Sequence, residues 1–408
     1  YLCYKNIHMK NFVLCLCLFL VTACGGGGGS TSEPDPIQTI SVNLSSSNLE
    51  AEVGTTITLT WSSTNAETCS ASGDWSGTKT TSGNEDVVIN SGTNLYNLSC
   101  SGSSAISGSA SIQVNGVISR INITNDIFSN RSSDCGDYDE NYESKVRDIT
   151  RVIDFEGYVD IEAGDQSCNL YSDNIPNHDF NDASANFRTD AIEKDRVFII
   201  SRSPQQASQN TQISRQTWDA VMLNGVVVDV KSGGCYYPSE SRADADGNTE
   251  AGCPQNAQWR LVPLEYSTKF GADIHNAHVQ PDGTYHYHGD PNAMFDDNPA
   301  GNGSPVIGFA ADGFPVYGSY ILDAITGTYR KVLSGYTLKE GTRGTKTDTN
   351  PGGEYSGIYE EDWEWTNSGD LDECNGMIYE NQYGYYVTDS YPFILNCFKG
   401  AVDSSFQK

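Results

Sequence analysis

Alternation of apolar and polar residues is the strongest regularity in this chain, and it predicts strands. Thr56–Trp61 alternates threonine with apolar residues, as a half-buried strand does. Asp86–Ile89, Leu95–Cys100 and Ser109–Val114 follow the same pattern, with glycine, serine and asparagine between them. Short strands separated by turn residues predict a β-sandwich over residues 37–115.

The remaining residues, 117–408, predict a larger β-rich domain. Ile149–Ile161 alternates well, and Arg196–Ile200 and Val226–Val230 are typical of buried strands. Glycine, proline, asparagine and aspartate break most of the rest into loops. Two short segments indicate helices: Ser184–Lys194 and Arg215–Met222.

Two cysteines accompany the aromatic residues of the predicted sandwich. Cys69 follows Trp61 by eight residues, and Cys100 lies four residues after Tyr96. Together with the strand pattern, this resembles the bacterial Ig-like domains of surface proteins, and the resemblance implies a spacer or stalk. The predicted fold class is therefore mainly β. An Ig-like β-sandwich precedes a larger β-rich domain with long disulfide-pinned loops and few short helices.

The start of the chain is typical of an export signal. Two lysines precede the apolar run Phe12–Val21, which is short for a membrane span, and small residues lead to Cys24. A cysteine at this point resembles the bacterial lipobox, which implies a lipid on Cys24 that anchors the protein in a membrane. The alternative is an ordinary signal cleaved nearby. We predict a lipoprotein signal peptide at 1–24 and a flexible linker at 25–36.

Export determines how the cysteines are interpreted. Eight of the twelve cysteines follow the signal, in successive and widely spaced couples, and no CxxC motif occurs. An oxidising compartment favours disulfides over thiolate metal sites. Spacing alone leaves other pairings open, but we predict four disulfides between successive cysteines: Cys69–Cys100, Cys135–Cys168, Cys235–Cys253 and Cys374–Cys397.

The charge balance restricts the partners. The chain has 53 acidic and 24 basic residues, for a net charge of −29. This argues against nucleic-acid binding, which needs clustered lysine and arginine. It suits a soluble, exposed protein. Gly25 follows Cys24, where an aspartate would signal inner-membrane retention, and this favours the outer membrane or cell surface.

Histidine is concentrated in residues 273–290. His286 and His288 are two residues apart among β-forming residues, so a strand would project both imidazoles from one face. The Pro281-Asp282-Gly283 sequence predicts a turn that returns the preceding histidines beside them. Imidazoles around one point bind transition metals, copper or zinc in an exported protein. The predicted ligands are His275, His278, His286 and His288. The alternative is a polar-aromatic strand whose histidines bond to backbone carbonyls.

Tyr285-His286-Tyr287-His288 resembles the tetrapeptide of the bacterial YHYH-domain proteins. Four further segments support the resemblance: Asn174–His178, Ala311–Tyr317, Leu371–Gly376 and Tyr391–Gly400. It implies a YHYH domain over 117–408 and no established activity. Residues 374–388 resemble a second copy of 275–288 that lacks histidine. Either the chain retains half of a two-copy site, or the second copy is structural.

Other polar residues are weaker candidates. His178 lies in a proline-containing loop, where it is either a further ligand, a residue that orients one, a general base, or a surface histidine. Asp312, next to a glycine, and Asp273 are catalytic or turn-forming candidates. Asp244–Glu250 places oxygen donors at alternate positions around a glycine, which indicates either calcium or a solvated acidic loop.

Two functions therefore compete. In the first, the YHYH domain binds a transition metal through the four clustered histidines, as a metalloenzyme or a metal-handling protein. In the second, it is a non-catalytic surface module that binds envelope polysaccharide or protein through the Tyr/His strand and the aromatic segment Tyr355–Trp365. The sequence leaves open whether the protein is an enzyme.

Overall fold

The computed structural model describes residues 39–103, 106–254 and 256–408. The predicted signal peptide, Cys24 and the linker lie outside the described residues. The chain divides into two compact units, Tyr1–Val117 and Ile118–Lys408. Strands dominate both units, so the mainly β prediction is confirmed. In the described ranges, no helix has the length and apolar character needed to cross a membrane.

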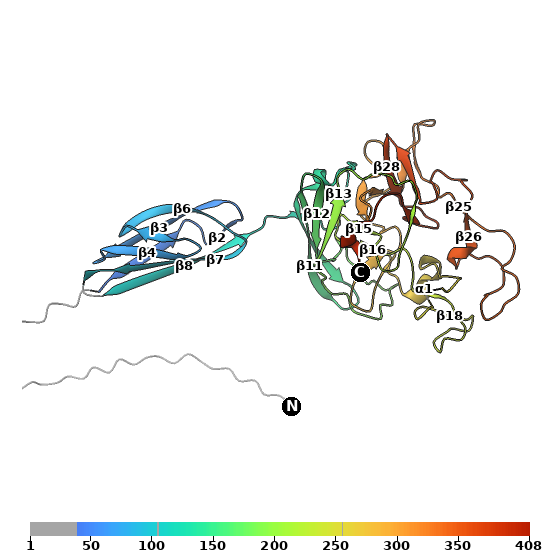
Figure 1. The fold of residues 1–408 in the computed structure, drawn as a ribbon, viewed down its shortest axis with the longest axis horizontal. Coiled ribbons are helices and arrows are strands. Elements are labelled where there is room, and N and C mark those ends of the chain that lie inside the picture. Colours follow the sequence, from blue (N-terminus) through green and yellow to red (C-terminus); the bar gives the residue numbers. More distant parts are fainter. Residues whose placement is uncertain (1–38, 104–105, 255) are drawn as a thin grey trace, which may run out of the picture. The chain divides into compact units, whose positions relative to one another are not determined.

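The described part of the first unit is a sandwich of two sheets with one core between them (Figure 1). Leu59 and Trp61 enter this core from one sheet, and Tyr96 and Leu98 enter it from the other. The three-stranded sheet, in the order β1-β3-β6, consists of β1 (Ser41–Ser46), β3 (Thr56–Thr64) and β6 (Ser82–Val88). The five-stranded sheet, in the order β2-β8-β7-β4-β5, consists of β2 (Glu50–Glu52), β4 (Thr68–Gly73), β5 (Gly77–Lys79), β7 (Gly92–Ser101) and β8 (Ser107–Val117).

The disulfide of this sandwich lies within one sheet. Cys69 and Cys100 are direct cross-strand partners on β4 and β7, with their Cα atoms 4.0 Å apart. In immunoglobulin domains the corresponding disulfide joins the two sheets. The layered architecture therefore agrees with the Ig-like interpretation and the disulfide position does not, so that relationship stays a prediction.

The second unit begins with a five-stranded sheet in the order β13-β12-β11-β10-β9. The predicted strand at 149–161 begins only at Ile153, because the chain turns just before it and Val152 has a φ of 57°. The Cys135–Cys168 disulfide ties the connection between β9 and β10 to β12, which lies next to the edge strand β13. The strands are β9 (Ile121–Asn122), β10 (Asn141–Asp148), β11 (Ile153–Ala163), β12 (Ser167–Ser172) and β13 (Arg196–Ser201).

An eight-stranded sheet forms the centre of the second unit, in the order β19-β20-β16-β15-β21-β22-β28-β27. Its strands are β15 (Ala220–Met222), β16 (Val227–Val228), β19 (Ala277–Val279), β20 (Tyr285–Tyr287), β21 (Val306–Ala310), β22 (Pro315–Tyr317), β27 (Gly376–Tyr379) and β28 (Gln382–Tyr386). The helix predicted at 215–222 is wrong, since its buried apolar end, Ala220–Met222, is β15 and pairs with β21. The helix predicted at 184–194 is also wrong, because that segment is an irregular loop in which Ala191 alone is fully buried, too little packing to stabilise a short helix.

The central sheet has an internal two-fold arrangement. β15 and β21 pair antiparallel at its middle, with Val221 opposite Phe309. On each side a tight hairpin follows, with Gly225 and Gly313 at φ values of 84° and 85°. The second strand of each hairpin, β16 or β22, pairs in parallel with β20 or β28. The outer strand, β19 or β27, completes each half. We call β15, β16, β19 and β20 the histidine half, and β21, β22, β27 and β28 the tyrosine half.

The five-stranded sheet packs on one face of the central sheet. Both contribute to a single hydrophobic core. Asn174 joins them, because its side chain donates to the carbonyl oxygen of Tyr285 at 2.8 Å and accepts from the backbone N–H of Val227 at 3.2 Å. Phe180 lies 5.2 Å from the ring of Tyr285 between the layers. The tyrosine side of β20 is therefore interior, and the histidine side faces the opposite way.

Short elements complete the second unit in long loops. The strand pairs are β14 (Thr211–Gln212) with β29 (Cys397–Phe398), β17 (Cys235–Tyr236) with β18 (Asn248–Thr249), β23 (Tyr320–Leu322) with β24 (Tyr329–Lys331), and β25 (Tyr336–Leu338) with β26 (Trp363–Trp365). The helix α1 spans Ser267–Phe270, and single 3₁₀ turns occupy Cys135–Tyr138, Leu264–Tyr266, Glu360–Asp362 and Ser404–Phe406. All four disulfides join the predicted cysteine pairs.

Candidate metal centre

A β-hairpin brings three histidines together. In the antiparallel pair β19–β20, His278 lies directly opposite His286. The predicted turn closes this hairpin, because the Gly283 N–H donates to the carbonyl oxygen of Gln280 at 2.9 Å. His288 follows His286 by two residues and therefore lies on the same face.

The three imidazoles form a nearly equilateral triangle. Their ring centroids are separated by 4.6 Å for His278–His286, 4.8 Å for His278–His288 and 4.7 Å for His286–His288. Their ligand nitrogens all lie within 4.8 Å of one another. The Nε2 atoms of His278 and His288 are 3.2 Å apart. Tetrahedral zinc, with Zn–N bonds of about 2.0–2.1 Å, holds its ligand nitrogens about 3.3 Å apart. The spacing therefore fits one transition-metal ion.

Backbone carbonyls fix the orientation of two of these rings. His278 Nδ1 lies 2.7 Å from the carbonyl oxygen of Phe270, and His286 Nδ1 lies 3.2 Å from that of Thr284. A protonated Nδ1 in each ring donates to its carbonyl and leaves the Nε2 lone pair for a ligand bond, as in metal-binding histidines. Because His278 Nε2 is then an acceptor, its 3.2 Å contact with His288 needs a proton or a cation between the two nitrogens.

Burial keeps the cluster uncharged. Desolvation lowers the pKa of His278 and lowers the pKa values of His286 and His288 well below the ordinary value, and the neighbouring His278 acts in the same direction on the other two. Neutral imidazole is the form that binds metals. Metal binding at neutral pH would therefore displace no proton from the ligand nitrogens of His278 and His286.

The cluster lines a cavity of about 340 Å³. Asp229, which continues from β16, lies on the same wall, and its Oδ2 accepts hydrogen bonds from Gln280 at 3.0 Å and from Lys408. The buried Oδ1 of Asp229 has no hydrogen-bond partner in the described part of the chain. The sequence interpretation missed Asp229 and Lys408. An alignment of Asn224–Asp229 with Asp312–Tyr317 would have marked Asp229 as a position where the two copies differ.

His275 and His178 lie together on the other side of the hairpin. His275 precedes β19, in a turn where Asn276 has a φ of 54°, so it does not continue the strand that carries His278. Its ring stacks on that of His178 with centroids 3.6 Å apart, and its Nδ1 contacts the carbonyl oxygen of Pro291 at 2.6 Å. His178 is buried, with Nε2 2.6 Å from the hydroxyl of Tyr287. The predicted set of four ligands thus becomes three, and His178 is no surface histidine.

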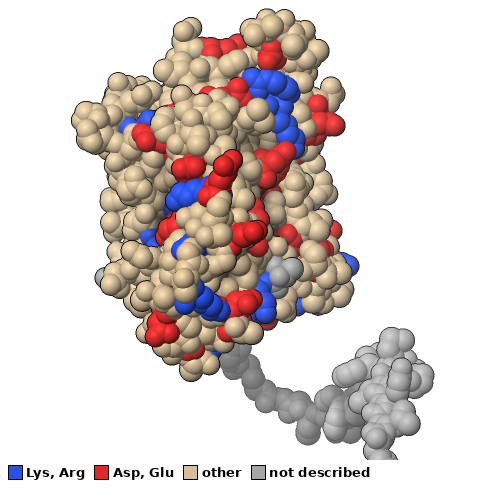
Figure 2. Space-filling model, turned by 90° about the vertical axis from the view of Figure 1, so that its right-hand side faces the viewer, with Lys and Arg blue, Asp and Glu red and all other residues tan. Residues whose placement is uncertain are grey.

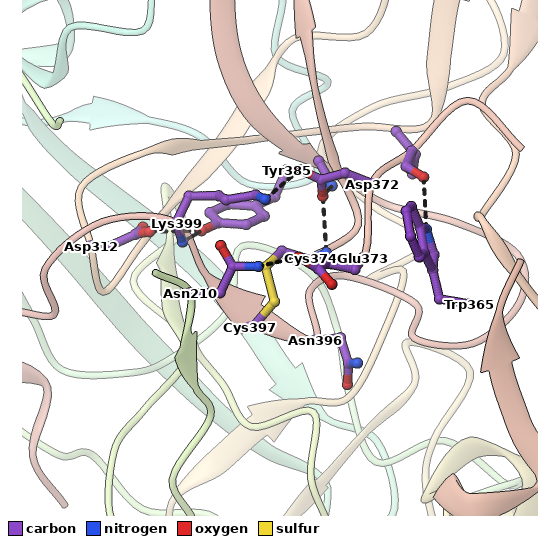
Figure 3. The surroundings of a disulfide bond; sticks show 12 residues. Asn210, Asp312, Trp365, Asp372, Glu373, Cys374, Tyr385, Asn396, Cys397 and Lys399 are labelled. Carbon is purple, nitrogen blue, oxygen red and sulfur yellow. Dashed lines mark hydrogen bonds and ion pairs between the residues drawn. A yellow bond between two sulfur atoms is a disulfide. The ribbon is translucent and has the colours of Figure 1, made fainter. Parts of the chain in front are cut away.

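The two aspartate candidates have structural partners. Asp273 accepts a hydrogen bond from the Tyr285 hydroxyl at 2.9 Å and caps the turn before β19 through the His275 N–H at 3.0 Å. Asp312 accepts a hydrogen bond from the Tyr385 hydroxyl at 2.6 Å (Figure 3). It also accepts one from the Gly400 N–H at 2.9 Å. Burial raises the pKa values of both carboxyls. Neither residue lines the cavity beside the histidine cluster.

The acidic loop uses its oxygen donors within the protein. Asp244 accepts backbone hydrogen bonds from Asp246 at 3.0 Å and Asn248 at 2.9 Å, and Glu250 pairs with Arg188 at 2.5 Å. Among the described residues, the groupings able to hold a metal do not include this loop. A second grouping, Asp134 with Cys135 and Cys168, contains the two sulfurs of a disulfide, which are not thiolate ligands.

The tyrosine half has no equivalent cluster. At the positions of His278, His286 and His288 it carries Met377, Gly384 and Tyr386, as the matching strand registers show. A Cβ atom at residue 384 would approach the ring of Tyr317 to 2.5 Å. The position of His275 is taken by Cys374, which is bonded to Cys397 (Figure 3). This half is thus filled by aromatic packing where the histidine half has a cavity.

The fold and the hairpin agree with one known family. No curated protein and no solved structure matches the chain. The model of the YHYH protein family matches residues 197–400, half of the chain, which contain the whole central sheet and both copies of the hairpin. This chain belongs to the YHYH protein family.

Proposed function

We propose that the YHYH domain binds one transition-metal ion through His278, His286 and His288, with a coordination position open to the cavity. The observation that carries the proposal is the triangle of three neutral imidazoles, of which His286 and His288 are buried and His278 is half-buried. Such a ligand set suits zinc or copper. A bound ion would act as a Lewis acid toward a water molecule or another ligand in the cavity.

The cavity favours a reactive centre over a storage or structural site. Structural zinc sites close their coordination sphere with four protein ligands, whereas catalytic sites keep three and an open position. Here three ligands face a volume of about 340 Å³. Asp229 offers an unpartnered Oδ1 on the same wall, which is an acceptor for a hydrogen bond from a molecule in the cavity. A metalloenzyme is therefore the function that accounts for the three ligands, the cavity in front of them and the free acceptor of Asp229.

Metal content tests the proposal directly. The chain should be expressed through an oxidising export pathway, loaded with zinc or copper, dialysed, and analysed by elemental mass spectrometry. We expect about one equivalent in the wild type, its loss in His286→Ala/His288→Ala, and its retention in His275→Gln, whose side chain lies across the hairpin. Less than a tenth of an equivalent in the wild type, or equal content in the double variant, would contradict the proposal.

The alternative function as a polysaccharide- or protein-binding module finds less support. Tyr285, Tyr287 and His286 of the Tyr/His strand are buried, so the strand offers no contact surface. In the aromatic segment Tyr355–Trp365, Trp363 stacks on Tyr391, and Trp365 is 42% exposed. Binding of envelope glycans that is lost in Trp365→Ala would support this alternative.

We also propose that the protein is held at the cell envelope by a lipid on Cys24. Its support is the lipobox-like sequence before Cys24 and the presence of four disulfides, which suit an oxidising compartment. Membrane fractionation of wild type and Cys24→Ala tests it. The wild type should sediment with membranes and the variant should become soluble, and equal partition of the two would contradict the anchor.

A further inference from the structure

The cavity beside the histidine cluster has a charge balance opposite to that of the chain. Acidic residues outnumber basic ones 53 to 24 in the sequence. On the face drawn in Figure 2, basic side chains lie beside acidic ones. Four basic residues line the cavity against two acidic ones, Asp229 and Glu250. The four are Arg188, Arg215, Lys231 and Lys408.

Carboxylates form ion pairs with these cations but do not neutralise all of their positive charge. Arg188 pairs with Glu250 at 2.5 Å, and Lys408 pairs with Asp229. Lys231 pairs with Glu360 at 2.7 Å, and that carboxylate also lies 3.6 Å from Arg215. Four cations and three carboxylates, counting Glu360 outside the cavity wall, leave one net positive charge. A divalent metal on the histidines would raise it to three.

The positions of the cations divide the cavity into a floor and a rim. The side chains of Lys231 and Lys408 are only 16% and 18% exposed, so they belong to the floor. Those of Arg215 and Arg188 are 37% and 69% exposed, so they belong to the rim. Positive charge in a recess with low-dielectric walls attracts anions more strongly than the same charge on an open surface. Arginine forks at a rim suit carboxylate and phosphate groups.

Apolar side chains occupy the rest of the wall. Phe187, Phe270, Val279 and Pro281 line the cavity together with the cations. A volume of about 340 Å³ is at the lower end of the range for small-molecule sites, roughly 300–1,000 Å³, and is larger than an inorganic anion needs. The wall thus matches a molecule with an apolar part and a charged end.

From these features we infer that the metal centre acts on a small organic anion, one whose carboxylate, phosphate or sulfate group lies among the arginine and lysine side chains while its apolar part contacts Phe187 and Phe270. This inference rests on the proposed metal site. It assigns the recognition of the anionic group to Arg188 and Arg215 at the rim and to Lys231 and Lys408 at the floor.

Calorimetric titration with matched probes tests the inference. Benzoate, phenyl phosphate and phenyl sulfate share an apolar ring and differ in the anionic group, and benzamide is a neutral counterpart. We expect at least one of the anions to bind metal-loaded protein at least about tenfold more tightly than benzamide does, with a preference that weakens as salt rises. Equal affinity for benzamide and all three anions, or no binding of any anion, would overturn the inference.

A double variant and a matched control test whether the rim arginines cause the preference for the anion over benzamide. Arg188→Gln/Arg215→Gln should reduce the preference for the anion to less than about threefold. Arg242→Gln is the matched control, because Arg242 is 68% exposed, pairs with Glu240 and does not line this cavity. A preference that is unchanged in the double variant, or equally reduced in the control, would contradict the assignment.

The same samples separate this inference from the proposed function. Metal content is measured on each before titration. Protein that holds one equivalent of metal but shows no anion preference would retain the metal site and lose the inferred ligand class. Protein that holds no metal but prefers the anion would retain the cationic recess and lose the metal site.

Discussion

The two halves of the central sheet share one scaffold. Asp273 and Asp372 each cap the turn before an outer strand through two backbone N–H groups and accept from a tyrosine hydroxyl. In the histidine half, the Tyr287 hydroxyl accepts a hydrogen bond from Asn224 at the hairpin turn. In the tyrosine half, the Tyr385 hydroxyl donates one to Asp312 at the corresponding turn. On this interior face, the halves are built in the same way.

The halves differ on the opposite face. There the histidine half has His278, His286 and His288 with Asp229, and the tyrosine half has Met377, Gly384 and Tyr386 with Tyr317. Tyr317 stacks on Tyr386 with centroids 5.0 Å apart and fills the space that a histidine at 384 would need. The comparison teaches that the tyrosines of the YHYH tetrapeptide support the fold, while its histidines form the candidate metal centre.

Exchanging one ligand position between the halves should have the largest effect. His288→Tyr gives the histidine half the residue of its counterpart, and we expect metal affinity to fall by about 1,000-fold, more than the 10–100-fold that loss of an outer partner causes. Tyr386→His should create no second site, because residue 384 has no room for a ligand. Competition with a chelating dye measures both affinities. A second equivalent of metal in Tyr386→His would break the comparison.

The disulfide of the tyrosine half should dominate its stability. Cys374 and Cys397 close a loop of 23 residues, and removing such a crosslink costs about 3 kcal/mol through the entropy of the unfolded chain. We expect Cys374→Ala/Cys397→Ala to lose about this free energy of unfolding in urea titrations. His275→Ala, at the corresponding position of the other half, should cost less because it breaks no crosslink. An equal loss in both variants would contradict this contrast.

The polar residue at each hairpin turn should resist exchange. In Asn224→Asp the buried donor to Tyr287 and Asn177 is lost, and in Asp312→Asn a carboxylate oxygen that faces the Phe314 N–H becomes a donor. Each change leaves a buried polar group without a partner, so we expect losses of about 2 kcal/mol by denaturant titration. Stability within about 0.5 kcal/mol of wild type would show that the halves are interchangeable at this position.

The smallest effect expected at a mildly acidic pH such as 5.5 is a pH dependence of stability due to His178, which contacts Tyr287 of the histidine half. Burial, with His275 as a second cause, lowers the pKa of His178 from its ordinary 6.5 to about 3. Below pH 6.5 the unfolded chain therefore binds a proton that the folded chain does not. This costs about 1.4 kcal/mol of folding stability per pH unit between pH 6.5 and pH 3.

The variant His178→Gln isolates the contribution of His178 to the pH dependence of folding stability. It should be less stable than wild type at pH 7.5, because its contact with Tyr287 is altered. Its deficit should shrink by about 1.4 kcal/mol for each pH unit below 6.5, since glutamine does not titrate. Urea titrations at pH 7.5 and pH 5.5 measure the two deficits. A deficit that is the same at both pH values would exclude the linkage.

Local patterns predicted the parts of this structure that depend on neighbours in sequence. The alternation at 284–288 and the turn at 281–283 placed His286, His288 and His278 on one face. His275 lies in the turn before β19, where alternation does not apply, and its position across the hairpin became apparent only in the structure. The helix assigned to 215–222 failed because a short buried run is compatible with both helix and strand, and pairing with β21 decides between them.

The rest of the site depends on contacts far apart along the chain. Asp229 and Lys408 are 179 residues apart, and no local pattern relates them. The cavity combines segments near residues 188, 215, 231, 250 and 280 with this lysine. Sequence periodicity therefore identified the three candidate metal ligands, with His275 wrongly added to them, while the charges around them became apparent only in the folded structure.

The two-fold pairing of β15 with β21 has an evolutionary consequence. Two separate chains of one four-strand unit, associating edge to edge through their first strands, would form the same eight-stranded sheet. Fusion of such a pair into one gene removes the constraint that both copies carry identical residues. In such a fused chain, one half is free to carry a disulfide and stacked tyrosines while the other keeps a recess with an aspartate that pairs with Lys408.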